Sequence, residues 1–505
     1  MERKNYTVAV DLGCSSVVVA VGEKTPEGLL DVVCIVSKPV EEGVHAGRIE
    51  NIELVSQAIR AAVSAAEEES GIRITEAYAG ISGDFVRCAR HTDHVFVYDP
   101  QNGVNQKDVD ALFDRMRNVQ APDDETIMER VPQNYMVDDD QEVRNPVGSF
   151  GKKLSSTFNF ILCQKTPMQR LDMALKRLGI RMLGVVSDAM ATPESVLLPD
   201  EKEEGVAVVN VGAGLTDVTV YYRNVVRYIA SIPMGASAIN RDIRTMSVPE
   251  KHVESLKQKY GSAVAELAPD DKLIRVNGRT AREAKDILLR NLATVIEARA
   301  TDIVEFVQQE IKDSGFAGKL AYGIVLTGGS AKLKDLDELF RRLTGLDVRV
   351  ALPESGITES SKEKVADPAF STVVGLLIRG SKLGGCAVLE RPVTAAAPQP
   401  AATPVPEPRQ PYVPTPPAAN TFRHVPPRTS QPTQPTQPTQ PIQPQMSPQP
   451  SAAEPVQPSS SAPVPDPVEE RQPSEPRRKR DWGSIFQKTF DKINKSFSAA
   501  EDEEI

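Results

Sequence analysis

The sequence predicts an α/β fold for about its first 390 residues, followed by a long spacer and a short tail. Short apolar strands alternate with amphipathic helices, and a strand–turn–strand unit occurs once in each half of this part. The prolines support the division, because 26 of the 40 lie between Pro392 and Pro476. We therefore expect a folded body over residues 1–390, a disordered proline-rich linker over 391–476 and a separate tail over 477–505.

The first strand–turn–strand unit lies at the start of the chain. Valine-rich segments at Tyr6–Val10 and Val17–Val21 predict two buried strands. Asp11 stands where the first strand ends, a position suited to holding Mg²⁺ through water. The turn that follows contains Gly13, Cys14, Ser15 and Ser16. Small residues let backbone N–H groups approach a phosphate, so the turn is a candidate anion site.

The second unit repeats this arrangement almost 200 residues later. Strands are predicted at Val206–Val211, at Val218–Tyr222 and, after a turn, at Val225–Ile229. The first two are joined by Gly212, Ala213, Gly214, Leu215 and Thr216. Neither unit is a P-loop, because GxxxxGK[ST] is absent and a strand, not a helix, follows each turn.

A third element completes the pattern. The segment Ile324–Leu326 predicts a strand that leads into a turn containing Gly328, Gly329 and Ser330, against which an adenine ring could lie flat. Before it, apolar residues from Ile287 to Ile311 keep a 3.6-residue period and predict a helix. Each turn alone is more often a plain hairpin, but their order and spacing together indicate one nucleotide site.

Composition excludes several classes of protein. The net charge of −10 argues against a general nucleic-acid binder. The five cysteines contain no CxxC pair, so a zinc site or a disulfide framework is not expected, and a reducing cytoplasm fits best. We see no signal peptide and no apolar run long enough to span a bilayer.

Taken together, DLGCSS, NVGAGLTD and LTGGSA resemble the phosphate-1, phosphate-2 and adenosine motifs of the actin/Hsp70/sugar-kinase ATPase superfamily. The resemblance implies two lobes, each built on a five-stranded mixed sheet, with ATP clamped between them. It places the first turn against the phosphates from one lobe and the second turn from the other. It also makes Glu254 and Lys257 candidates for contact with ribose and adenine, although a solvated charged helix explains these two nearly as well.

Within that superfamily the chain resembles the FtsA family of actin-like bacterial cell-division proteins. The resemblance rests on Val131–Tyr135 (VPQNY), Asn145–Gly148 (NPVG), Ala79–Gly83 (AGISG) and Ser187–Leu197 (SDAMATPESVL), and it covers about residues 5–385. It implies a subdomain 1C at 84–163, inserted in the first lobe and contributing to head-to-tail filaments. It also implies a subdomain 2B at 246–319 that docks the tubulin-like protein FtsZ.

The phosphate-2 motif departs from the family pattern. It usually begins with an aspartate that helps to hold the metal and its attacking water, and here the residue is Asn210. Ala213 and Leu215 also replace an expected glycine and threonine. An asparagine lacks the negative charge that would bind the magnesium shell. We therefore expect ATP binding with slow or negligible hydrolysis.

The tail combines an aromatic stripe with basic residues. At 100° per residue, one helical face would carry Trp482, Ile485, Phe486, Phe490, Ile493 and Phe497. The basic residues are Arg477, Arg478, Lys479, Arg480, Lys488, Lys492 and Lys495. This pattern is typical of an amphipathic helix at an anionic membrane surface, and FtsA proteins carry such a helix. A helix that packs on a partner protein is the alternative.

Two rival functions use the same fold. A sugar or carboxylate kinase needs a catalytic carboxylate aimed at a substrate hydroxyl, and the sequence nominates none. An actin-like pilus-platform protein would also be cytoplasmic and bind ATP, but it should lack VPQNY and NPVG as placed here. The preferred reading is a polymerising division protein on the cytoplasmic face of the inner membrane, bound to ATP, FtsZ and anionic lipid but not to nucleic acid.

Overall fold

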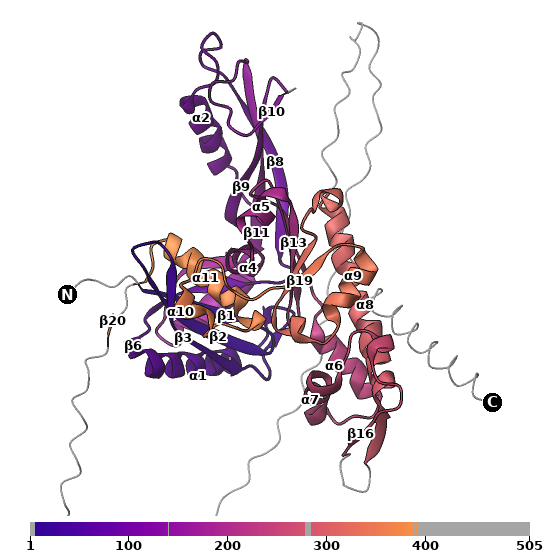
Figure 1. Ribbon diagram of the computed structural model, residues 1–505. Coiled ribbons are helices and arrows are strands. Elements are labelled where there is room, and N and C mark those ends of the chain that lie inside the picture. The colour runs from indigo at the N-terminus through magenta and orange to yellow at the C-terminus, as the bar shows by residue number, and fades with distance from the viewer. Residues whose placement is uncertain (1–5, 140, 278–283, 387–388, 391–505) are drawn as a thin grey trace, which may run out of the picture. The chain divides into compact units, whose positions relative to one another are not determined.

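The computed structural model contains two five-stranded sheets with the same strand connectivity, one in each half of the folded part (Figure 1). The structure describes residues 6–139, 141–277, 284–386 and 389–390. The predicted linker over 391–476 and the predicted tail over 477–505 lie outside these residues, so both stay predictions.

The first sheet has the order β12-β7-β1-β2-β3 and is mixed, because β1 pairs antiparallel with β2 and parallel with β7. Helices α1 and α3 pack on one side and α4 and α11 on the other, which explains why β2 is apolar at successive positions. The bounds are β1 Tyr6–Leu12, β2 Ser16–Lys24, β3 Leu30–Pro39, β7 Glu76–Ile81, β12 Arg181–Ser187, α1 Ile52–Ser70, α3 Lys165–Lys176, α4 Asp188–Val196 and α11 Ser371–Lys382.

The second sheet has the order β15-β14-β13-β18-β19 and repeats the first. Its first strand, β13, pairs antiparallel with β14 and parallel with β18, as β1 does with β2 and β7. The mixed α/β fold with two five-stranded sheets is therefore confirmed. The bounds are β13 Val206–Val211, β14 Thr216–Tyr222, β15 Val225–Ile232, β18 Ile324–Thr327, β19 Val348–Val350, α5 Pro199–Glu204, α6 Ala236–Thr245, α8 Leu289–Asp313 and α9 Leu336–Thr344.

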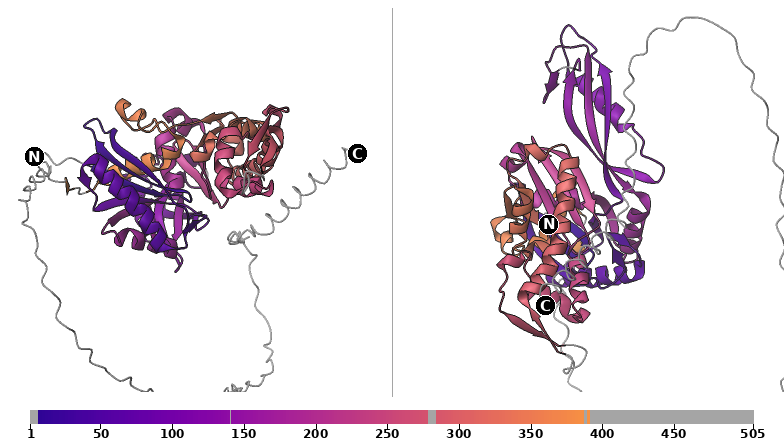
Figure 2. Two further views of the ribbon diagram at one scale, coloured as in Figure 1. Left: turned by 90° about the horizontal axis from the view of Figure 1, so that it is seen from below. Right: turned by 90° about the vertical axis from the view of Figure 1, so that its right-hand side faces the viewer.

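Between β7 and α3 the chain forms a separate four-stranded antiparallel sheet of order β10-β9-β11-β8, covered by one helix (Figure 2). We call residues 84–163 the inserted subdomain. Leu112 and Met116 of its helix are fully buried, and Leu154 and Phe158 of β11 are buried with them. The bounds are β8 Val86–Phe96, α2 Gln106–Arg117, β9 Glu125–Val137, β10 Gln141–Val143 and β11 Lys153–Gln164.

A second excursion leaves the second lobe after β15. It comprises α6, α7, the hairpin of β16 and β17, and the long helix α8. The sequence predicted helix from Ile287, but Ile287 and Leu288 belong to β17 and α8 begins at Leu289. The cause is local pairing, since Ile287 lies opposite Ile274 in the hairpin. The remaining bounds are α7 Glu250–Tyr260, β16 Leu273–Val276, β17 Lys285–Leu288, β4 Val44–His45, β5 Arg48–Ile49, β6 Ile72–Arg73, α10 Glu359–Lys362 and β20 Leu389–Glu390.

Among the described residues, no helix has the length and apolar character needed to cross a membrane.

Candidate nucleotide-binding site

A cavity of about 730 Å³ lies between the two lobes, where the strands of the two predicted units end. This volume falls within the range of sites for small molecules and cofactors. The predicted residues that line the cavity are Asp11, Gly13, Cys14, Ser15, Ser16, Asn210, Gly212, Ala213, Gly214, Leu215, Glu254, Lys257, Gly328, Gly329 and Ser330. The fold thus brings together four segments that are far apart in the sequence.

The two turns have the same backbone closure. In the first, the Gly13 N–H donates to the Ser16 carbonyl at 2.9 Å, and in the second the Gly212 N–H donates to the Leu215 carbonyl at 2.8 Å. A strand follows each turn, as the sequence predicted. Turns of small residues that face each other from two lobes are suited to hold a phosphate chain through backbone amides.

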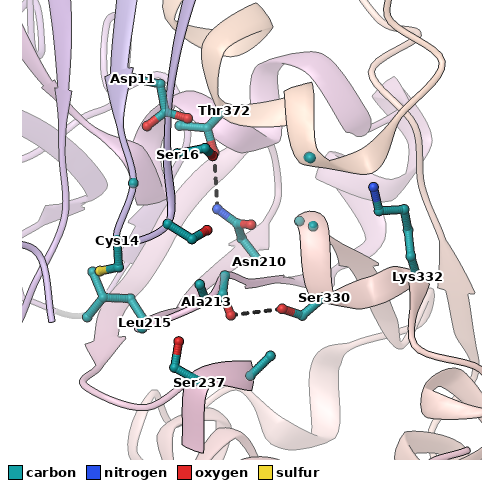
Figure 3. A pocket seen from close by; sticks show the side chains of 18 of the residues that line it. Asp11, Cys14, Ser16, Asn210, Ala213, Leu215, Ser237, Ser330, Lys332 and Thr372 are labelled. Atoms are coloured by element: carbon teal, nitrogen blue, oxygen red, sulfur yellow. Dashed lines mark hydrogen bonds between the residues drawn. The ribbon is translucent and has the colours of Figure 1, made fainter. Parts of the chain in front are cut away.

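Helix α6 supports the second turn. Its amides at Ala236 and Ser237 donate to the carbonyls of Gly212 and Ala213 at 3.1 and 2.7 Å. Ser237 reaches the cavity below the turn (Figure 3). Because the N-terminus of a helix carries partial positive charge, α6 makes this end of the cavity favourable for an anion.

The turns also touch across the cleft. A Cβ at Gly214 would lie 2.7 Å from Cys14 Sγ, so only glycine fits against the thiol. Cys14 Sγ in turn accepts a hydrogen bond from the Gly47 N–H at 3.4 Å, and Leu215 lies beside it (Figure 3). Burial raises the pKa of the Cys14 thiol, which therefore stays neutral at pH 7. The lobes are in van der Waals contact at this point.

Glu254 and Lys257 of α7 face the cavity rather than solvent alone. Lys257 is 8% exposed, and its Nζ lies 2.8 Å from Glu254 Oε2, which also accepts from Asn240 Nδ2 at 2.6 Å. Burial works to raise the pKa of Glu254, but hydrogen bonds from Lys257 and Asn240 lower it below its ordinary value. The carboxylate is therefore charged and held in one orientation.

The turn after β18 closes the opposite wall. Gly328 has φ 90°, and a Cβ there would run into the Val211 carbonyl, so this position requires glycine. Ser330 Oγ donates to the Gly212 carbonyl at 2.9 Å and ties this turn to the second phosphate turn (Figure 3). The third predicted element thus meets the second one directly.

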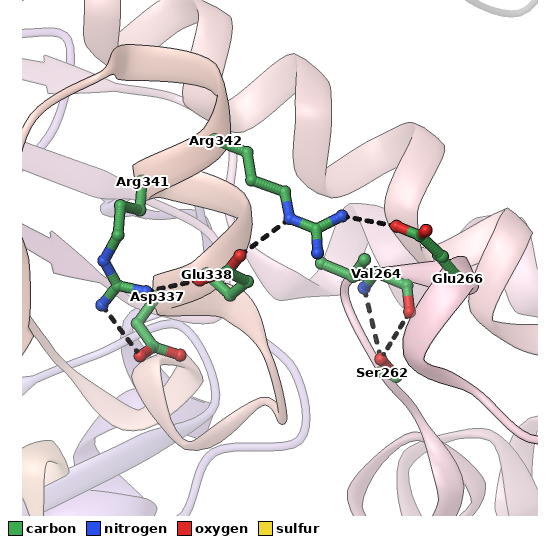
Figure 4. A network of polar contacts seen from close by, with 7 residues as sticks. All are labelled: Ser262, Val264, Glu266, Asp337, Glu338, Arg341 and Arg342. Atoms are coloured by element: carbon green, nitrogen blue, oxygen red, sulfur yellow. Dashed lines mark hydrogen bonds and ion pairs between the residues drawn. The ribbon is translucent and has the colours of Figure 1, made fainter.

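A polar network holds this wall to the segment that follows α7. Arg342 of α9 lies between Glu338 and Glu266, with nitrogen–oxygen distances of 2.8 and 2.9 Å (Figure 4). Ser262 donates to the Val264 carbonyl at 2.9 Å and to Asp335 Oδ2 at 2.6 Å, just before α9. These contacts fix the end of α7 against α9, and with it the position of Glu254 and Lys257.

Three aspartates line the cavity, the half-buried Asp11 and the buried Asp188 and Asp217, and sequence reasoning assigned only Asp11 to the site. Burial and then the charge of Asp217 raise the pKa of Asp11 to about 7. Burial, followed by the charges of Asp11 and Asp217, raises the pKa of Asp188 well above its ordinary value. Asp188 Oδ1 is buried and has no hydrogen-bond partner among the described residues. A cation near these carboxylates would offset their mutual repulsion.

Asp217 is held from both lobes. Its Oδ1 accepts from Ser82 Oγ, which follows β7 in the first lobe, and from Ser231 Oγ of β15, both at 2.5 Å. Burial raises the pKa of Asp217, and these two hydrogen bonds partly offset that effect. Asp217 directly follows the second turn, and Asp188 lies in the SDAMATPESVL segment. Both are acidic residues in or beside these two motifs, and this was the sequence signal that could have assigned them to the site.

Asn210 occupies the end of β13 and contacts the first lobe. Its Nδ2 donates to Thr372 Oγ1 at 3.1 Å, and Thr372 Oγ1 lies 3.0 Å from Thr192 Oγ1 (Figure 3). An aspartate here could not donate this hydrogen bond. The carboxamide therefore links the lobes where the family motif usually places a carboxylate.

Thr216 is the one predicted residue that the structure keeps out of the site. It is the first residue of β14, is fully buried, and its hydroxyl donates to the Met234 carbonyl at 2.8 Å. Because the turn ends one residue earlier, Thr216 does not line the cavity, and its assignment to the nucleotide site stays a prediction. Polar cavity residues that the sequence did not assign to the site are Ser82, Asp188, Asp217, Ser237, Asn240, Gln258, Lys332 and Thr372.

Comparison with known proteins decides the family. The family model described as "Cell division protein FtsA" matches residues 207–375, and the model "SHS2 domain inserted in FTSA" matches residues 83–162. The cell division protein FtsA of Pseudomonas aeruginosa is 32% identical over 376 residues, covering 74% of this chain and 88% of that protein. The chain belongs to the FtsA family. The FtsA of Escherichia coli is 29% identical, with 78% of this chain and 95% of that protein covered.

Solved structures confirm the fold. A chain of the "PilM-PilN type IV pilus biogenesis complex" superposes with a TM-score of 0.51 at 14% identity, covering 74% of this chain and 98% of that chain. At this identity the likeness concerns the actin-like fold alone. The FtsA matches, by contrast, span both lobes and the inserted subdomain, and they favour a division protein over the pilus-platform alternative.

Proposed function

We propose that the chain binds ATP in the cleft between its lobes, polymerises on the cytoplasmic face of the inner membrane, and tethers FtsZ there. The observation that carries the proposal is the cavity of about 730 Å³ between two turns of equal geometry, in a chain of the FtsA family. The two turns line one part of the cavity and would be its anion-binding end, while Gly328, Glu254 and Lys257 line another part.

The residues present fit a nucleotide. Amides of the two turns that are not used to close the turns would bind the phosphates. The first amides of α6 donate to the second turn, so this helix would contribute the partial positive charge of its N-terminus. Glu254 is a fixed, charged acceptor suited to ribose hydroxyls, and the flat turn at Gly328 and Gly329 leaves room for a base.

The residues also fit Mg²⁺ held through water. No group of three metal-ligating side chains among the described residues is arranged to bind an ion directly. Magnesium commonly retains its waters and takes one or two carboxylates together with substrate phosphates. Asp11 would hold this hydrated shell, and when bound the ion would neutralise phosphate charge. With Asn210 in place of an aspartate, we expect slow or negligible hydrolysis.

The membrane and partner roles rest on sequence and family. The basic aromatic tail from Arg477 to Phe497 would lie at the bilayer surface, where each basic residue contributes about 1 kcal/mol. One such helix is a reversible anchor, so assembly through the inserted subdomain would supply the multivalency that stable attachment needs. FtsZ would dock on residues 246–319. The linker of 86 residues would let the body stand about 50 Å from the membrane as a coil.

Liposome co-sedimentation tests this function. The full chain is mixed with anionic vesicles and FtsZ, with ATP or ADP, and compared with a Phe486→Glu, Phe490→Glu double variant. We expect the chain and FtsZ to pellet together only when the tail is intact, and more fully with ATP. Equal pelleting of the double variant would overturn the membrane role. FtsZ left in the supernatant beside pelleted chain would overturn the tether.

A further inference from the structure

The inserted subdomain is joined to the first lobe through the chain, but it is also hydrogen-bonded to the second lobe. Gln133 and Asn134 of β9 and Asn159 of β11 face β15, the edge strand of the second sheet. Their partners on β15 are Val226 and Arg227. We call these five residues the latch. Gln133 and Asn134 belong to the VPQNY segment, which does not line the nucleotide cavity.

The latch uses main-chain groups of an edge strand of the second sheet, at a point where Val226 and Arg227 are both buried. Gln133 Nε2 donates to the Val226 carbonyl at 3.0 Å, and Asn159 Nδ2 donates to the Arg227 carbonyl at 2.9 Å. An edge strand presents unpaired carbonyls, and here side-chain amides of the inserted subdomain satisfy them. Asn159 is 1% exposed, so at least one of these bonds is shielded from water.

Arg227 completes the latch from the other side. It is 3% exposed, and its Nη1 donates to Asn134 Oδ1 at 3.0 Å and to Gln133 Oε1 at 3.3 Å. Its Nε donates to the Tyr222 carbonyl at 3.0 Å. Its guanidinium makes no ion pair with a carboxylate of the described residues, and burial lowers its pKa. Hydrogen bonds from a buried cation to neutral acceptors are strong. Opening the latch would return the Arg227 charge to water, and this hydration would offset part of the cost of breaking the hydrogen bonds.

Two exposed ion pairs extend the contact outward. Arg223 in the β14–β15 turn lies 3.3 Å from Glu142 of β10, and Arg144 after β10 pairs with Glu203 of α5. The inserted subdomain is thus fixed at its base by the chain of the first lobe and along its flank by the second lobe. A rotation of one lobe against the other must either move the subdomain or break the latch.

We propose that the latch couples the nucleotide cleft to the inserted subdomain, so that lobe closure on a nucleotide swings the subdomain with the second lobe. This inference rests on the proposed nucleotide binding and adds to it a movement of the inserted subdomain. The hydrogen bonds of the latch hold the subdomain to β15, so a movement of the second lobe is passed to the subdomain as long as they stay formed. In this proposal the function of the VPQNY segment is to bind the edge of β15 and so to transmit the movement of the second lobe to the inserted subdomain.

Hydrogen exchange measured by mass spectrometry on the full chain tests the coupling. Exchange is compared without nucleotide and with Mg·ADP, at a concentration where sedimentation shows monomer, so that filament contacts do not protect the subdomain. A Gln133→Ala, Asn134→Ala double variant removes the latch hydrogen bonds of β9 and leaves that of Asn159, and Arg227→Met removes the hydrogen bonds that the guanidinium donates to Gln133 and Asn134. Gln106→Ala, which removes an exposed contact to Asp110 on α2, is the matched control.

In the native chain and in Gln106→Ala, nucleotide is expected to slow exchange both in the two turns and in peptides at β9 and β15. In the latch variants the turns should still respond, while the response of β9 falls by roughly fivefold for each hydrogen bond lost. If the turns respond but β9 behaves alike in native chain and latch variants, the coupling is wrong. If the turns of the native chain do not respond at all, nucleotide binding itself fails, and the coupling fails with it.

Discussion

Replacing Asp11 by asparagine should make the nucleotide-free chain more stable at pH 8 and leave its stability at pH 4 unchanged. Burial and the charge of Asp217 raise the pKa of Asp11 from 3.8 to about 7. The folded chain therefore holds this proton more tightly than the unfolded chain, and its stability falls as pH rises from about 4 to about 7. Three pKa units at 1.36 kcal/mol each set the loss at up to about 4 kcal/mol. Asparagine keeps the shape and removes the charge.

Urea unfolding followed by circular dichroism, between pH 4 and pH 8 and without nucleotide, measures this effect. The difference between the native chain and Asp11→Asn should grow with pH and level off near pH 8. The difference in stability also includes the loss of repulsion between Asp11 and Asp188, because the charge of Asp11 helps to raise the pKa of Asp188. Glu68→Gln, on the exposed side of α1, is the control and should track the native chain. Parallel curves for native chain and Asp11→Asn would refute the buried-acid interpretation of the cleft.

Three further predictions follow from particular contacts. Gly214→Ala should weaken binding of a fluorescent ATP analogue by roughly tenfold through overpacking against Cys14, and a second change, Cys14→Gly, should restore it; no restoration would place the clash elsewhere. Asn210→Asp should raise phosphate release from ATP in a magnesium-dependent way, and release that stays at background would count against the role given to residue 210. Arg299→Leu removes the ion-pair partner of the buried Asp242 carboxylate and should lower the free energy of unfolding in urea by about 3–5 kcal/mol, whereas Lys176→Ala, at a pair whose lysine is exposed, should change it by under about 1 kcal/mol; similar losses would contradict the burial argument.

The two phosphate turns could be predicted because their signals are local. Small residues between two valine-rich strands specify a tight turn wherever they occur, and the structure closes Gly13 to Ser16 and Gly212 to Leu215 in the same way. The fold followed from the repeat of this unit. The helix start was missed at Ile287 because strand pairing with Ile274 overrides a helical period that continues through it.

The acid cluster and the latch depend on contacts between distant segments. Asp188 and Asp217 meet Asp11 only because β1 and β12 end, and β14 begins, at the same cleft, and no spacing in the sequence encodes that meeting. Gln133 belongs to the VPQNY segment that resembles the FtsA family, but its partner, the Val226 carbonyl, is a main-chain group with no sequence signature. Site residues that act through burial or through backbone partners are therefore the ones that sequence reasoning misses.

Titration calorimetry of the full chain with ATP in the presence of Mg²⁺ tests the central claim most directly. The account predicts one ATP bound per chain, weaker binding when Mg²⁺ is removed, and a large loss of affinity in Gly214→Ala but not in the distant Gln106→Ala. No heat of binding in the native chain, or binding that Gly214→Ala leaves unchanged, would contradict a nucleotide site between the two turns.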